Sequence, residues 1–415
     1  MSIQGLRHTA NFVDDQRPKN WREGILLLWP NGQAPLTGLT SVMRSESTDD
    51  PQFHWWDKKL ARQRLQLDAS TGTGDSLTVT ERAQTVVKGH ILKIEETGEI
   101  VRVTEDPSNS TTIPVQRGFS GTTATGIDPT LAGKNPNVLV IGTAFEEGSF
   151  SPTGVNYDPV KRYNFTQIFR NSLEMTRTAE KTRLRTGDQV REAKRECLEL
   201  HSIEMEKAFW FGERWEGTMN GKPVRTTGGV LSMIPSENTR TPQGDGVSLY
   251  QLEEWLKDVF LFGNQEKMGY CGNRALLTIQ RIIRYNTEYR LEQGQKEYGM
   301  NVSRLICPFG TLVLKTHPLF NYAPGGTTDG TEYFGYDSML VILDMENLRY
   351  RYLTDSDTKY KADIQENDLD GKKSEYLTEA GLELHHPDTH FLIRGLTNAI
   401  RDAEPEQAEA EGGEE

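Results

Sequence analysis

Three histidines near the carboxyl end of the chain, His385, His386 and His390, are the only cluster of side chains whose type and spacing suggest metal chemistry. Imidazole nitrogens are common zinc ligands, but they must converge on a single ion. Pro387 lies inside the cluster and interrupts any helix that would present the three rings on one face. The pattern therefore does not predict a metal site.

Motifs for nucleotide and hydrolase chemistry are also missing from the sequence. Residues 217–223, GTMNGKP, approach a phosphate-binding loop, but their spacing is wrong and Pro223 follows the lysine. Gly72 and Gly74 lack the third glycine of a dinucleotide-binding fingerprint, and no serine stands in a G-x-S-x-G motif. We therefore expect no catalytic, cofactor-binding or metal-binding residues, and we expect that the protein is not an enzyme.

Length and charge limit the remaining function classes. A chain of 415 residues is longer than one hydrophobic core usually serves, so two or three subdomains are expected. Only 35% of the residues are hydrophobic, which indicates either a large surface or apolar faces that neighbouring molecules complete. The net charge of −13 disfavours sequence-independent binding to phosphate backbones, but it leaves room for a local basic face.

Cysteine usage and hydropathy bear on the compartment. Cys197, Cys271 and Cys307 are far apart in the sequence, so neither a disulfide framework nor a zinc ribbon is indicated. The amino terminus lacks the apolar run of a signal peptide, and no stretch is long enough to span a bilayer. We expect a soluble protein that is intracellular when made and has no membrane partner.

The element that must position the others is a long helix predicted from Gly187 to Gly212. Asp188 is its expected N-cap, and Gly212 is its expected end. An apolar stripe at three- and four-residue spacing is formed by Val190, Ala193, Cys197, Leu200 and Ile203. Glu206 lies off this stripe. We interpret the helix as a packing spine rather than as an active site.

The region before this helix has a β pattern. Apolar residues alternate with polar ones around a turn at residues 96–98, which predicts a hairpin. Further short strands are predicted at residues 113–116 and 138–141. Because bulky residues are few, we expect that the region cannot close its own core. The hairpin would then offer an apolar face to a neighbouring subunit, formed by Leu92, Ile94, Val101 and Val103.

The carboxyl half mixes helices and strands. A second helix is predicted from Ser248, which forms a capping box with Gln251, and a third from about residue 274 to residue 292. Strands are predicted at residues 305–306, 311–315, 339–343, 348–353 and 391–394. Seven of the last fifteen residues, 401–415, are acidic and none is aromatic, so this tail is expected to be disordered.

Two further sets of residues are candidates for contacts between subunits. Trp55 and Trp56 point to opposite faces of an extended chain, as in a buried strand or in an intersubunit anchor. Residues 160–195 carry ten basic and four acidic side chains, a local charge of +6. That excess fits a solvated face paired with acidic neighbours, or a surface that touches packaged nucleic acid. The basic candidates are Arg183, Arg191 and Arg195.

Several segments together resemble a known family. They are FHWWDKKL (53–60), TGEIVRVTED (97–106), IPVQRGFSGTTAT (113–125), YNFTQIFRNSLEMTRTA (163–179), EMEKAFWFGE (204–213) and RTTGGVLSMI (225–234). In this order they resemble the major capsid proteins of tailed bacteriophages with the Hong Kong 97-type fold, and more narrowly the SU-ten-type major head proteins. The resemblance covers most of residues 10–400, and none of its segments is a catalytic motif.

The resemblance implies an α+β fold and a division of the chain. An N-arm would span residues 1–50, and an enlarged β-rich extended loop would span residues 51–155. The peripheral domain with the spine helix would span residues 156–234, and the axial domain residues 235–345. The chain would return to the peripheral domain at residues 346–400 and end in the acidic tail.

The implied function is that of a major capsid protein, assembled as hexamers and pentamers into an icosahedral shell around a double-stranded DNA genome. Its partners would be copies of itself, portal, scaffold and cement proteins, and DNA on the inner face without sequence specificity. Its location would be the virion, and the host cytoplasm during assembly. Two alternatives stay open, a cellular nanocompartment shell and a β-rich enzyme or carbohydrate-binding protein.

Overall fold

The structure is a computed structural model, and it divides the chain into two compact units. Unit 2 comprises Trp56–Lys161, and unit 1 comprises the chain before and after it. The expected N-arm up to residue 42, Arg183 and the acidic tail lie outside the described residues. The structure describes residues 43–58, 63–68, 74–126, 137–182, 188–242, 246–285, 291–297, 300–322, 326–328, 331–333 and 335–400.

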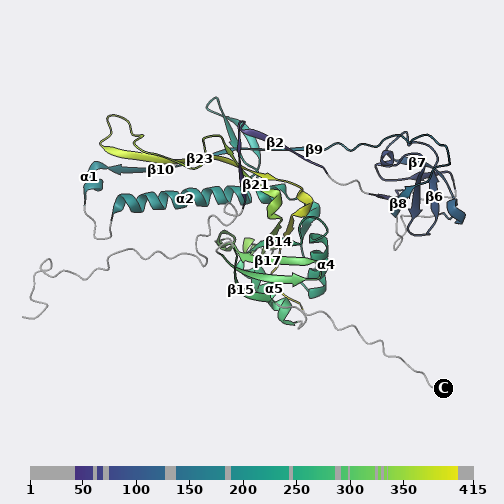
Figure 1. Ribbon diagram of the computed structural model, residues 1–415. Helices are drawn as coiled ribbons and strands as arrows, with labels where there is room; N and C mark the ends of the chain where they lie inside the picture. Colours follow the sequence, from purple (N-terminus) through teal and green to yellow (C-terminus); the bar gives the residue numbers. More distant parts are fainter. Residues whose placement is uncertain are drawn as a thin grey trace, which may run out of the picture. The chain divides into compact units, whose positions relative to one another are not determined.

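The first layer of unit 1 is a sheet of five strands with the order β1-β21-β23-β10, and β22 pairs with β23 (Figure 1). The two longest strands, β10 and β23, are antiparallel along their whole length, with Gln167 opposite Ala380 and Thr176 opposite Gly371. The strands are β1 (Arg44–Thr48), β10 (Gln167–Thr176), β21 (Leu348–Leu353), β22 (Lys359–Lys361) and β23 (Gly371–Leu384).

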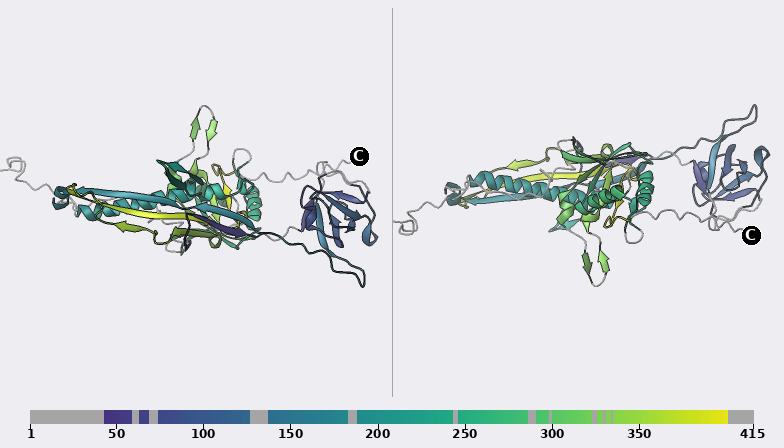
Figure 2. Two further views of the ribbon diagram at one scale, coloured as in Figure 1. Left: turned by 90° about the horizontal axis from the view of Figure 1, so that it is seen from above. Right: turned by 90° about the horizontal axis from the view of Figure 1, so that it is seen from below.

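The predicted long helix is confirmed as α2 (Gln189–Phe211), which follows the short α1 (Arg177–Lys181). The Asp188 carboxylate accepts hydrogen bonds from the Val190 and Arg191 backbone N–H groups, a cap that stabilises a helix by about 1 kcal/mol. Gly212 ends the helix as expected. Figure 2 shows α2 running along β10 and β23 in both views.

The predicted apolar stripe of α2 is only partly right. Leu200 is exposed, whereas His201 and Glu206 are buried together with Cys197, Met205, Phe209 and Trp210. The reason is that the neighbouring strands supply polar partners. His201 Nδ1 lies 2.6 Å from Asn171 Oδ1 on β10, and its Nε2 lies 2.7 Å from Thr378 Oγ1 on β23. A hydrogen-bonded imidazole can therefore occupy a core position.

The second layer of unit 1 is a sheet of seven strands with the order β13-β24-β20-β14-β17-β16-β15. Its strands are β13 (Thr239–Arg240), β14 (Glu266–Cys271), β15 (Leu291–Glu297), β16 (Met300–Cys307), β17 (Gly310–Thr316), β20 (Leu340–Leu343) and β24 (Phe391–Ile393). The helices α4 (Leu249–Val259) and α5 (Asn273–Tyr285) share a core with it. The Ser248 hydroxyl accepts a hydrogen bond from Gln251 N, so this predicted cap is confirmed.

The predicted third helix is too long at its carboxyl end. It ends at Tyr285, and Leu291–Glu297 is strand β15. This segment pairs with the antiparallel β16, so main-chain pairing within the sheet overrides its weak helical pattern. Smaller elements complete unit 1, namely the hairpin of β11 (Trp215–Met219) and β12 (Lys222–Thr226), α3 (Val230–Met233), and the pair β18 (Gly326–Thr328) and β19 (Thr331–Tyr333).

Unit 2 is a sheet of six strands with the order β3-β8-β5-β6-β7-β4. The predicted hairpin is confirmed as β5 and β6, with Gly98 at a φ of 71° in its turn. The strands are β3 (Arg64–Gln66), β4 (Ser76–Thr78), β5 (His90–Ile94), β6 (Ile100–Val103), β7 (Thr112–Gln116) and β8 (Asn137–Thr143).

The expectation that this region cannot close its own core is wrong. Its buried cluster includes Leu65, Leu77, Ile113 and Val138, from strands other than the hairpin. These side chains cover the hairpin from within the same unit. The chain passes between the units along β2 (Gln52–Asp57) and β9 (Val160–Phe165), which pair with each other.

Candidate functional site

Within the residues that the structure describes, no group of three or more His, Cys, Asp or Glu side chains is placed to hold a metal ion. The histidines of the sequence cluster have structural partners instead. His385 pairs with Glu383, and His390 Nδ1 accepts a hydrogen bond from Asp344 N at 3.2 Å. No helix in the described part of the chain is long and apolar enough to cross a membrane.

Two of the segments that carry the family resemblance meet strand β23 at one buried junction, although all three are far apart in the sequence. Asn164 is fully buried, and its Nδ2 donates to Gly228 O at 3.1 Å and to Leu382 O at 2.6 Å. Its Oδ1 accepts hydrogen bonds from Phe165 N and Gly228 N. One side chain thus joins β9, β23 and the chain that follows β12.

The end of α2 is also packed against this junction through glycines. A Cβ atom on Gly229 would lie 2.8 Å from Gly212 N and 2.9 Å from Ala208 O. Both neighbours are backbone atoms, which cannot move aside as a flexible side chain can. The close approach of these backbones therefore explains the second glycine, Gly229, in the segment RTTGGVLSMI.

A second buried group joins α2 to the segment after β17. Trp210 Nε1 donates to Glu206 Oε1 at 3.0 Å, and His317 Nε2 lies 3.1 Å from the same oxygen. The Trp210 ring packs edge-on against Phe320, with 5.0 Å between the ring centroids. Sequence reasoning placed Glu206 on the polar face of α2, and no local signal indicates its partner His317. This contact fixes the seven-stranded sheet to the end of the long helix.

Unit 2 contains a buried ion pair that holds a loop. Arg117 Nε donates to Glu99 Oε1 at 2.8 Å, and Arg117 Nη2 donates to Glu99 Oε2 at 2.6 Å. The carboxylate also accepts hydrogen bonds from Gly118 N and Thr125 N. Burial raises the pKa of Glu99, but these hydrogen bonds outweigh it and hold that pKa below its ordinary value. The pair therefore orders residues 117–125.

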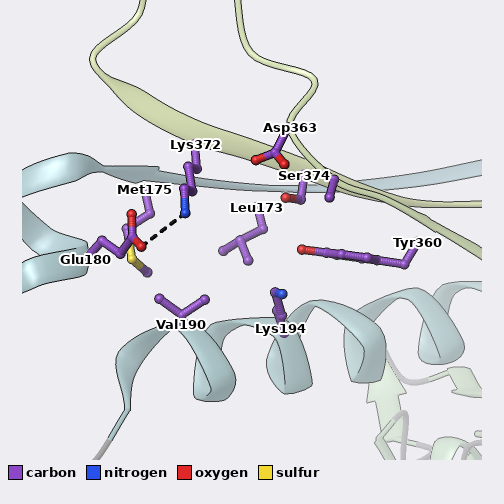
Figure 3. A pocket seen from close by; sticks show the side chains of 10 residues that line it. Leu173, Met175, Glu180, Val190, Lys194, Tyr360, Asp363, Lys372 and Ser374 are labelled. Carbon is purple, nitrogen blue, oxygen red and sulfur yellow. Dashed lines mark hydrogen bonds and ion pairs between the residues drawn. The ribbon is translucent and has the colours of Figure 1, made fainter.

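The hollow between α2 and the strands β10 and β23 has a volume of about 180 Å3 (Figure 3). Its lining is mixed. Leu173, Met175 and Val190 present apolar surface, Lys372 pairs with Glu180 at 3.1 Å, and Lys194 lies 4.7 Å above the Tyr360 ring. These charges already have partners within the chain. The arrangement is that of an incompletely packed helix face.

Comparison with known proteins identifies the family. The model of the SU10 major capsid protein family matches residues 6–397. The chain belongs to this family. A curated relative, the major capsid protein of Pseudomonas phage PaMx41, is 28% identical over 419 residues, which cover 95% of this chain and 96% of the relative.

Several solved structures are similar to this SU10-family protein. A chain of the native GTA particle capsid has 8% identity and a TM-score of 0.48, with 95% of this chain and 100% of that chain covered. A chain in the structure of the Mycobacterium phage Bobi has 8% identity and a TM-score of 0.43, with 94% of this chain and 97% of that chain covered. The SrpI encapsulin of Synechococcus elongatus PCC 7942 has 11% identity and a TM-score of 0.42, with 59% and 80% covered.

Membership of the SU10 family confirms the resemblance seen in the sequence. The protein is a major capsid protein of a tailed phage, and its mixture of helices and sheets confirms the predicted α+β fold class. The family is one of structural capsid proteins rather than of enzymes, and its members are parts of the virion. A capsid protein assembles with copies of itself, so its functional site is its surface.

The prediction that the hairpin offers an apolar face to a neighbouring subunit is corrected by the structure. Leu92, Ile94, Val101 and Val103 have no exposed surface and fill the core of unit 2. Their own unit covers them, so they are not available to a neighbouring subunit in this structure.

The two tryptophans differ in exposure, because successive side chains of a strand point to opposite faces. Trp55 is buried beside Phe53 and His385, with 6.0 Å between ring centroids in each case. Trp56 is 61% exposed. Of the two, only Trp56 has the exposure that a contact with another subunit needs.

The three basic candidates also differ in their surroundings. Arg195 pairs with Glu192 at 2.6 Å and with Glu199 at 3.5 Å on its own helix. Arg191 is exposed, and Arg183 lies outside the described residues. Other basic side chains of residues 160–195 also have acidic partners in the chain, as in Arg170–Glu375 and Arg177–Asp370. This pairing favours the solvated-face interpretation of the local positive charge.

Exposed apolar side chains that the sequence analysis missed are stronger surface candidates. Leu261 and Phe262 follow the end of α4 and are 68% and 53% exposed. Trp215 and Met219 are exposed on the hairpin of β11 and β12. An apolar pair directly after a helix end, and an Asn-Gly turn beside a tryptophan, are the signals that could have found them.

Proposed function

We propose that this chain forms hexamers and pentamers that close an icosahedral shell around a double-stranded DNA genome. The observation that carries the proposal is the family match over residues 6–397. Exposed apolar side chains at separate places on unit 1 support it, because a shell subunit must meet several neighbours at once. Many modest contacts of this kind stabilise a closed shell through multivalency.

In this proposal each part of the chain has a role in the shell. Residues 1–50 act as an N-arm, and unit 2 takes the place of the extended loop expected at residues 51–155. Residues 156–234, with α2, form the peripheral domain, and residues 346–400 return to it. Residues 235–345 form the axial domain, and residues 401–415 remain a tail.

The proposed partners follow from the shell. Portal, scaffold and cement proteins bind the assembled subunits, and DNA contacts the inner face without sequence specificity. Assembly takes place in the host cytoplasm. Because many basic side chains of residues 160–195 have acidic partners, DNA contact should depend little on that segment.

Electron microscopy of the purified full-length chain tests the proposal, with light scattering on the same sample. The expected result is closed shells or ring-shaped capsomers. A monomer in every buffer, with one cooperative unfolding transition, would contradict it. Shells isolated from infected cells should contain DNA, whereas shells that hold a cargo enzyme in place of DNA would favour a nanocompartment.

A further inference from the structure

Unit 2 contains a second hollow, with a volume of about 280 Å3. It lies between the sheet and the segment that runs from Pro152 to Tyr157. Aliphatic surface comes from Val87, Val140 and Val155. None of these residues belongs to the ion pair of Glu99 and Arg117 or to the covered hairpin face, so the features described above leave this hollow without a role.

The hollow is electrically neutral. No Asp, Glu, Lys or Arg side chain lines it, in a chain of which 26% of the residues are charged. The hollow beside α2 differs, because Glu180, Lys194 and Lys372 are among its lining residues. A charged ligand would lose water in the neutral hollow and gain no ionic partner there. Its chemistry therefore selects an uncharged ligand.

Four neutral polar side chains on this hollow have hydrogen-bonding capacity that no described residue uses. The Gln63 amide, the Thr143 hydroxyl and the Tyr157 hydroxyl have no side-chain hydrogen bond to any described residue. His90 Nδ1 accepts a hydrogen bond from Val87 N at 2.8 Å, so the neutral ring carries its proton on Nε2. Burial lowers the pKa of His90, which favours this neutral form.

The walls of the hollow are held in place before any ligand arrives. Thr153 Oγ1 donates to Asp106 Oδ2 at 2.7 Å, and Asp106 Oδ1 accepts a hydrogen bond from Lys88 N at 2.8 Å. The segment after β8 is thereby tied to the start of β5. On the sheet side, His90 and Thr143 are opposite each other in the pairing of β5 with β8. Binding therefore requires little ordering of the protein.

We propose that this hollow binds one neutral pyranose ring, the size and chemistry of a single hexose residue. A pyranose presents hydroxyl groups at its edge and C–H groups on its faces, which match neutral donors and acceptors beside aliphatic walls. The volume lies just below the range of about 300–1,000 Å3 that holds drug-sized ligands, so one ring is the fitting size. An aliphatic side chain from another subunit would leave four polar groups unpaired.

Saturation-transfer NMR on the full-length protein tests this inference, both as free subunits and as shells. The probes are the methyl pyranosides of glucose, galactose, mannose and N-acetylglucosamine at millimolar concentration. At least one should receive saturation from the protein. Glucuronic acid and glucose 6-phosphate should receive less, because the hollow offers their charges no partner.

Two variants connect the signal to the hollow. Gln63→Ala and Tyr157→Phe each remove hydrogen-bonding capacity, and each should weaken pyranoside binding about two- to tenfold. Tyr250→Phe is the control, since Tyr250 is a strongly exposed tyrosine on α4 in unit 1 and should bind sugar as the wild type does. Unchanged thermal unfolding of all three variants would show that the fold is intact.

Three results would overturn the inference. The first is that no neutral pyranoside receives saturation from the wild-type protein. The second is binding that Gln63→Ala and Tyr157→Phe leave unchanged. The third is binding of 4-methylphenol, a side-chain analogue, without binding of any pyranoside, because the hollow would then be a socket for a protein side chain.

Discussion

Arg117 and Glu99 form a bidentate ion pair in unit 2, with 4% and 0% of their side chains exposed. The two residues come from opposite ends of the stretch that contains β6 and β7. The Glu99 carboxylate also accepts hydrogen bonds from the backbone N–H groups of Gly118 and Thr125. An ion pair at this depth is strongly destabilising when only one partner is lost, because the other charge stays buried. The pair is therefore a sensitive point of unit 2.

Replacing Arg117 with Met should destabilise unit 2 by about 3–5 kcal/mol, because the Glu99 carboxylate would stay buried without its cation. Urea denaturation followed by hydrogen exchange within residues 90–116 measures the loss. Arg64→Met is the matched control, since Arg64 pairs with Glu95 on the same sheet but is exposed, and its loss should hardly move the midpoint. Equal effects of the two variants would contradict a special role for the buried pair.

The same pair predicts a dependence on acid. The pKa of Glu99 is lower in the folded protein than in the unfolded chain, so its stabilisation is complete above the ordinary glutamate pKa of about 4.3. It is lost as the pH falls further, through the folded-state pKa. Unit 2 should therefore lose more stability between about pH 6 and about pH 3 in the wild type than in Glu99→Gln. Parallel curves for both proteins would refute this prediction.

His201 should add a second dependence at higher pH. Burial lowers the pKa of His201, an effect that the nearby Glu204 partly opposes. The neutral ring therefore stabilises unit 1 fully above the ordinary histidine pKa of about 6.5, and this contribution declines as the pH falls below it. In His201→Gln, the midpoint of denaturation should change less with pH between about pH 7.5 and about pH 5 than in the wild type. A slope as steep as that of the wild type would show that another group is responsible.

Gly229→Ala should destabilise unit 1 by about 1–3 kcal/mol, because the new methyl group would collide with the backbone at the end of α2. Gly74→Ala makes a good comparison, since nothing lies within 4 Å of a Cβ atom at Gly74. Its stability should equal or slightly exceed that of the wild type. Thermal denaturation of both variants gives the answer, and a Gly229→Ala protein as stable as Gly74→Ala would exclude the close packing described here.

The double variant Leu261→Asp and Phe262→Asp should fold normally and fail to form complete shells. Both side chains are exposed in the single chain, so their replacement costs little folding energy, whereas two buried charges would oppose a contact between subunits. Circular dichroism checks the fold, and sedimentation checks the assembly. Glu254→Gln, an exposed change on the preceding helix α4, should assemble as the wild type does. Full assembly of the double variant would remove this surface from the candidates.

The parts of the fold that depend on local sequence could be predicted. The cap at Asp188, the cap at Ser248 and the hairpin turn at Gly98 each rest on a few adjacent residues, and all three are present. The buried positions of His201 and Glu206 could not be predicted in the same way. They depend on Thr378 and His317, which are more than one hundred residues away in the sequence.

The closed core of unit 2 escaped prediction for a related reason. Its cover comes from very short strands, such as β3 and β4 with three residues each, and such strands leave little trace of alternation. Leu65 and Leu77 each stand between two polar residues, and both are buried in that core. The candidate surfaces were missed because exposure is a property of the folded chain, and Leu261 resembles a core leucine in every local respect.

The pairing of β2 with β9 places the start and the end of the 106 residues of unit 2 on adjacent strands. A segment whose two ends meet can be removed, enlarged or exchanged in a gene without changing the path of the remaining chain. Evolution can therefore vary this piece of a capsid protein independently of the rest. For the same reason, an engineer could join Trp56 to Lys161 by a short linker, or insert a foreign peptide there for display on a particle.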